Sequence, residues 1–152
     1  MQLAPSGRFV FVAQWVLAVV LPLFLFLGRA ALGAPLGWTA VLGAGFGALI
    51  TVLLLVPPVL ALFDPVAREA RSVRSRYALV TIVMWVGLVV AALAIPDADD
   101  AGELPSVLGV WFGVPGAGSV IVFGIAAGVA MLAWIAAVVT AIHGIVAGRR
   151  GD

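Results

Sequence analysis

The sequence predicts an all-α integral membrane protein with four antiparallel transmembrane helices and a short interfacial helix in its outer loop. Three observations lead to this fold class. The 152 residues are 64% hydrophobic and only 10% charged, with a mean hydropathy of +1.27. Four long apolar runs carry no charged residue. Most of the arginines fall in segments that would share one side of a bilayer.

This composition argues against a water-soluble domain. Soluble domains are about half apolar and a quarter charged, and a chain of this length cannot bury so much apolar surface in its own core. We therefore treat residues 1–152 as a single four-helix transmembrane domain. The chain has no cysteine, which excludes disulfides, thiolate nucleophiles and thiolate metal ligands.

Spanning helices are expected at about 9–27, 38–63, 65–95 and 119–147. Each contains close to the roughly 20 uncharged apolar residues that a span needs, the third from Tyr77 onward. Only helices and closed barrels satisfy the backbone in hydrocarbon, and these runs lack strand-like alternation. The first run is longer than the roughly 7–15 apolar residues of a cleaved signal peptide, so we expect it to be retained; cleavage near Ala34 is the alternative.

The third helix is expected to begin before its apolar run. Asp64 is a good N-cap and Pro65 suits the first helical position. One apolar stripe then follows at helical spacing, made by Val66, Ala70, Val73 and Tyr77. This pattern predicts a continuous helix over 65–95, whose first three turns lie along the inner headgroups.

An arginine cluster at 68–76 sets the expected orientation, because arginine-rich short loops stay in the cytoplasm. Four helices place both termini on that side, which then holds seven arginines against three acidic residues. We expect a plasma-membrane protein with cytoplasmic termini, in which the cluster contacts anionic lipids. Its members are Arg68, Arg71, Arg74 and Arg76. A nucleic-acid site would need a basic surface on a soluble fold, and a voltage sensor would need counter-carboxylates within the spans.

The outer loop, 96–118, has an acidic half and an apolar half. The acidic half fails as a calcium loop, since Leu108 stands where an EF-hand needs glutamate, and we expect it to be solvated. The apolar half predicts a short helix, which lies at the outer interface or covers the bundle as a lid, because one face collects Leu104, Val107, Leu108, Trp111 and Phe112. Trp38 and Trp111 are expected at the outer interface and Tyr77 at the inner one.

Small residues at helical spacing predict close helix packing. The second helix carries Gly43 and Gly47, and the fourth carries Gly124 and Gly128. Such pairs let helix backbones approach closely in lipid. We expect the second and fourth helices to make the tight contacts, either within one chain or between copies.

A polar layer is expected at one depth near the inner face, where Gln14, Thr81 and His143 fall at similar distances from the ends of their helices. Pro57 in the second helix cannot donate a backbone hydrogen bond and so frees a carbonyl. Two hypotheses remain open. In the first, the polar groups hydrogen-bond to the freed carbonyl and so stabilise the kink. In the second, they form a small pocket in which His143 titrates near neutral pH.

No catalytic, cofactor-binding or metal-ligating residues are expected, and we do not expect an enzyme. The chain has one histidine, no cysteine and no charged residue within any of the four apolar runs. The favoured function is a non-catalytic accessory or scaffold subunit of a membrane complex. The alternative is a small oligomeric channel or transporter for a neutral or weakly charged solute. The expected partners are lipids, a membrane protein or a second copy, and no nucleic acid.

The arginine distribution predicts the orientation of the chain. A reporter enzyme that is active only outside the cytoplasm should be silent when fused after Asp152 and active when inserted at Asp99. The opposite activities would show that the charges do not orient this chain.

Overall fold

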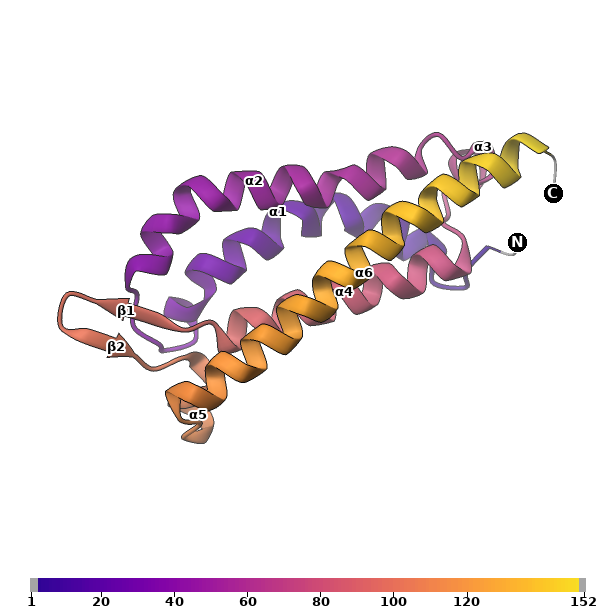
Figure 1. Cartoon of the computed structure of the whole chain (residues 1–152). Helices are drawn as coiled ribbons and strands as arrows, with labels where there is room; N and C mark the ends of the chain where they lie inside the picture. The colour runs from indigo at the N-terminus through magenta and orange to yellow at the C-terminus, as the bar shows by residue number, and fades with distance from the viewer. Residues whose placement is uncertain (1–2, 151–152) are drawn as a thin grey trace.

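The computed structural model describes residues 3–150, and four helices in this range are long and apolar enough to span a membrane: α1 (Gly7–Ala31), α2 (Trp38–Ala61), α4 (Ser75–Ala94) and α6 (Gly116–Arg150). The described residues also form two short helices, α3 (Pro65–Ala70) and α5 (Val107–Phe112), and two short strands. The long helices lie side by side (Figure 1). Both chain ends and α3 lie at one end of the molecule, here called the termini end, while the strands and α5 lie at the hairpin end (Figure 1).

The glycine pair of α2 packs against α1. A Cβ added at Gly43 would lie 2.5 Å from the Cβ of Phe26, and one at Gly47 would lie 3.6 Å from the Phe26 ring. Gly43 therefore needs to lack a side chain for the Phe26 side chain to fit between the two helices. The buried residues of α2 all lie in its second half and are Leu54, Pro57, Pro58 and Ala61.

The most extensive helix contact joins α4 and α6, and not α2 and α6 as the glycine spacing suggested. A Cβ at Gly87 of α4 would lie 3.1 Å from both the carbonyl oxygen of Ala126 and the Cβ of Ala130. The same face of α6 continues through a buried alanine stripe, Ala133, Ala137 and Ala141. Small side chains allow this close approach.

The glycine pair of α6 lies off this contact. Nothing lies within 4 Å of a Cβ placed at Gly124 or Gly128. The pair is two residues away from Ala126 and Ala130, which rotates it by about 200° around the helix. Gly124 and Gly128 therefore make no packing contact within the described residues. This corrects the expected contact within one chain, and a contact between copies stays a prediction.

The helix expected over 65–95 is interrupted. α3 ends at Ala70, Arg71 adopts a left-handed conformation (φ 49°), and α4 begins only at Ser75. The intervening backbone pairs with the start of the chain: Ala4 N–H donates to Val73 O at 3.0 Å, and Val73 N–H donates to Gly7 O at 3.3 Å. The apolar stripe could not reveal this break, because it depends on residues distant in the sequence.

The acidic half of the 96–118 segment is an antiparallel hairpin of β1 (Asp97–Asp99) and β2 (Gly102–Leu104). The Asp99 carboxylate accepts hydrogen bonds from Ala101 N–H and Gly102 N–H in the turn. The expected short helix is α5, which Ser106 caps through Gly109 N–H and which ends at Gly113 in the left-handed region. The expected solvated loop is thus an ordered hairpin joined to a capped helix.

A larger side chain at Gly87 should force α4 and α6 apart. We expect Gly87→Leu to destabilise the protein by about 2 kcal/mol, as overpacked contacts do, and to lower the midpoint of thermal unfolding in mild detergent. Gly124→Leu is the matched control, because that position has free space around it. Equal unfolding midpoints for both variants would contradict the assignment of the α4–α6 contact.

Candidate functional site

A buried polar cluster joins α1 and α4 beneath the prolines of α2. The Tyr77 hydroxyl donates to Gln14 Oε1 at 2.8 Å, and Gln14 Nε2 donates to Phe11 O at 3.1 Å. Thr81 Oγ1 is buried and has no hydrogen-bond partner within residues 3–150. A cavity of only about 10 Å³, the space of about one water molecule, is lined by Gln14, Tyr77, Thr81 and Pro57. Tyr77, expected at the inner interface, is instead part of this core.

His143 does not belong to this cluster. Its side chain is exposed, whereas Ala141 and Gly144 on the same helix face the core. A separation of two residues from Ala141 turns His143 by about 200° away from the bundle. Counting residues from the helix end gives the depth of His143 in the membrane. It does not give the direction in which the side chain points around the helix axis. Of the four residues expected in the layer, the structure brings together Gln14, Pro57 and Thr81.

The carbonyl that Pro57 frees is satisfied by a residue that sequence reasoning missed. Trp134 Nε1 of α6 donates to Leu53 O at 2.8 Å, and Leu53 lies four residues before Pro57, where a regular helix would use the missing N–H. A tryptophan in the middle of a span, away from the interfacial belts, was the available signal.

The arginine cluster is divided. Arg68, Arg71 and Arg76 are exposed, as expected for groups at a membrane surface. Arg74 is buried, with its Nε 2.6 Å from Asp64 Oδ2 and its Nη2 3.2 Å from Asp64 Oδ1. Arg74 is therefore one half of an internal ion pair, which corrects its expected contact with lipid.

Asp64 also caps α3, accepting hydrogen bonds from Val66 N–H and Ala67 N–H. The carboxylate lies against glycines of α6: a Cβ at Gly144 would be 2.8 Å from one of its oxygens, and a Cβ at Gly148 would be 2.7 Å from the other. The two glycines make room for a charged pair between the helices. The Asp64–Arg74 pair thus fixes both the turn after α2 and the start of α4 against α6.

A second buried pair lies at the hairpin end. Arg29 is 1% exposed, its Nη1 lies 2.8 Å from Asp97 Oδ2, and its Nη2 donates to Pro105 O at 2.7 Å. Asp97 was expected in the solvated acidic loop, and Arg29 lies beyond the end of the first expected helix, 9–27. Instead α1 extends through Arg29, and the pair joins the end of α1 to β1 and to the segment before α5.

Asp97 also holds the start of α2. Its oxygens accept hydrogen bonds from Gly37 N–H, Thr39 N–H, the Thr39 hydroxyl and Ala98 N–H. Burial alone would raise the pKa of the Asp97 carboxyl. The hydrogen bonds from Thr39, Ala98 and Gly37 outweigh burial, so the pKa lies below its ordinary value.

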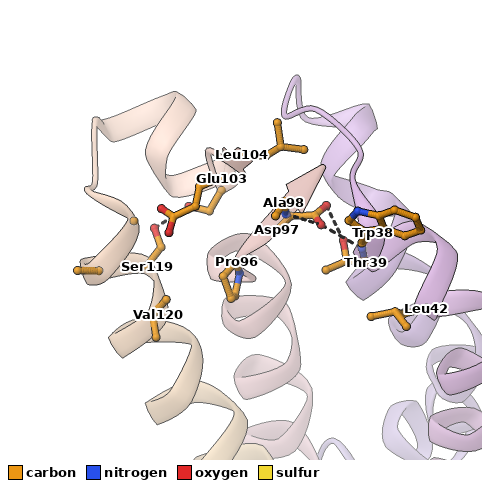
Figure 2. Close-up of a pocket in the computed structure, with 13 residues that line it drawn as sticks. Trp38, Thr39, Leu42, Pro96, Asp97, Ala98, Glu103, Leu104, Ser119 and Val120 are labelled. Carbon is orange, nitrogen blue, oxygen red and sulfur yellow. Dashed lines mark hydrogen bonds between the residues drawn. The ribbon is translucent and has the colours of Figure 1, made fainter. Parts of the chain in front are cut away.

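A cavity of about 590 Å³ opens beside this pair, between the beginnings of α2 and α6 and under the hairpin (Figure 2). One part of its wall is apolar, formed by Trp38, Leu42, Pro96, Ala117 and Val120. The other part is polar, formed by Thr39, Asp97, Glu103, Ser106 and Ser119. The hydroxyls of Ser106 and Ser119 lie 2.7 Å apart and are buried. Sequence reasoning missed this cavity, because its walls come from four separate segments.

Groups of three or more histidine, aspartate or glutamate side chains that could hold a metal ion are not found among residues 3–150.

The Asp97 interactions predict an acid-sensitive contribution to stability. With a lowered pKa in the folded state, the carboxylate stabilises the fold fully above its ordinary pKa of 3.8, and this contribution is lost as the pH falls through the lower folded value. Asp97→Asn leaves Arg29 buried without a counter-charge, so we expect a loss of about 3 kcal/mol at neutral pH. The variant should also lose part of the wild-type decline below about pH 4.

Thermal unfolding in detergent across that pH range measures both effects. Asp99→Asn, at the exposed hairpin turn, is the control and should behave like wild type at neutral pH. A neutral-pH stability of Asp97→Asn equal to that of the control would contradict the importance of the pair.

No protein family, curated protein or solved structure matches the chain.

Proposed function

We propose that the chain is a non-catalytic accessory or scaffold subunit of a plasma-membrane complex, built as an antiparallel four-helix bundle with both termini in the cytoplasm. The orientation is supported by the charges that remain after internal pairing. The exposed groups at the termini end include Arg8, Arg68, Arg71, Arg76 and Arg149 against Glu69. The exposed charges at the hairpin end are Asp99, Asp100 and Glu103. With the two buried pairs set aside, the exposed arginines among the described residues all lie at the termini end, and this is the distribution that the positive-inside rule uses.

The subunit function is proposed because the rest of the described chain covers little of the surface of α2. In its most apolar 18-residue window 6% of the residues are buried, compared with 50% in α4. The small-residue face of α6 at Gly124 and Gly128 is also open. Lipid can cover any apolar surface, whereas small residues specifically allow a second helix to approach. These faces are suited to contacts with another membrane protein.

The channel or transporter alternative has less support. It rested on a polar layer open to the cytoplasm and on His143 as its titrating group. The Gln14–Tyr77–Thr81 cluster encloses only about 10 Å³, and His143 faces away from it. A conducting path would have to be formed by several copies of the chain.

Crosslinking in native membranes, followed by purification in mild detergent and quantitative mass spectrometry, tests the proposal. We expect a different membrane protein in a fixed ratio to the chain. Gly124→Leu and Gly45→Leu probe the two open faces, since both positions have free space and should keep the fold. Loss of the partner with only one variant would locate the interface.

A complex that contains only copies of this chain would contradict the subunit proposal and favour the oligomeric alternative. Partner binding unchanged by both variants would exclude the faces proposed here.

A further inference from the structure

We propose that the 590 Å³ cavity at the hairpin end binds an amphiphile whose headgroup carries an ammonium group, namely an amine-bearing lipid of the outer leaflet. The inference uses the membrane orientation proposed above. It does not depend on whether the chain has a protein partner.

The cavity lies at the level where three spans end. Trp38 is the first residue of α2, Gly116 is the first of α6, and Pro96 follows the end of α4. All three residues line the cavity, which places it at the depth of the lipid headgroups. Its volume is within the range of about 300–1,000 Å³ that small-ligand pockets occupy.

The cavity also opens sideways toward the bilayer. Leu42 of α2 and Val120 of α6 both line it, yet each side chain remains 51% exposed. They stand on opposite sides of the space between the two helices (Figure 2). A lipid can enter between them and leave its acyl chains along the apolar groove, with its headgroup under the hairpin.

The charge inside the cavity favours a cation. Asp97 contributes no free charge, because Arg29 and four hydrogen bonds occupy its oxygens. Glu103 is different: neither ion pair seen within residues 3–150 includes it. The Glu103 carboxylate therefore supplies the uncompensated negative charge of the lining. Asp99 and Asp100, exposed on the same hairpin, add to the negative potential at the entrance.

Two further groups suit the rest of such a headgroup. Trp38 lines the cavity and is 53% exposed, and aromatic rings attract ammonium groups. Ser106 Oγ already accepts from Gly109 N–H, and the Ser106–Ser119 contact uses one hydroxyl hydrogen. The other hydroxyl hydrogen can donate to a phosphate or ester oxygen.

Native mass spectrometry of the purified protein in maltoside detergent tests the proposal. Three probes are titrated: phosphatidylethanolamine, phosphatidylglycerol with the same acyl chains, and phosphoethanolamine without chains. We expect the ethanolamine lipid to bind at least tenfold more tightly than either other probe, since only this lipid offers both the ammonium group and the chains.

Two variants connect this binding to the cavity. Glu103→Gln should weaken binding of the ethanolamine lipid about tenfold, and Ala117→Trp should abolish it by filling the space. Glu69→Gln, an exposed carboxylate at the termini end, is the matched control and should bind like wild type. Unfolding temperatures without lipid confirm that each variant folds.

Three results would overturn the proposal. Equal binding of phosphatidylglycerol would remove the role of the ammonium group. Equal binding of phosphoethanolamine would identify a site for a soluble cation, which does not use the apolar wall. Unchanged lipid binding in folded Glu103→Gln and Ala117→Trp would place the lipid elsewhere on the protein.

Discussion

The pairing of charged groups that are removed from water is the constraint on which this structure depends. Transferring a single charge out of water costs several kcal/mol unless a counter-charge and hydrogen bonds replace its hydration. The chain meets this requirement with a buried Arg–Asp pair at each end of the molecule, Arg74–Asp64 and Arg29–Asp97. In both pairs the aspartate also accepts backbone N–H groups at the start of a helix, α3 for Asp64 and α2 for Asp97.

The two pairs organise the connections that helix propensity alone leaves undefined. At the termini end, Asp64 and Arg74 bracket α3 and the left-handed Arg71, and they hold this turn against the glycines of α6. At the hairpin end, Arg29 and Asp97 tie three connections to one another, and Asp97 also lines the cavity. Between the ends, small residues at the α4–α6 contact and the Trp134 hydrogen bond to α2 hold the spans together.

The spans and α5 could be predicted because each depends on local sequence: a long apolar run, or a short apolar face between proline and glycine. The depth of a residue along a helix could also be estimated by counting residues from the helix end. This count put Gln14 and Thr81 at the depth of Pro57, and the three residues line one small cavity. Rotation about the helix axis could not be counted in this way, and His143 shows the consequence. The ion pairs join segments that no periodicity relates, so Arg74 was assigned to the lipid surface and Asp97 to solvent.

The most direct test of this account is a double-mutant cycle on Arg74 and Asp64, measured as the free energy of unfolding in detergent at neutral pH. Asp64→Asn keeps a side chain that can cap α3, while Arg74→Gln removes the opposite charge. Each single variant should lose about 3 kcal/mol, because it leaves a buried charge unpaired, and the double variant should be more stable than either. Losses that simply add in the double variant would contradict the claim that buried charge pairing organises the fold.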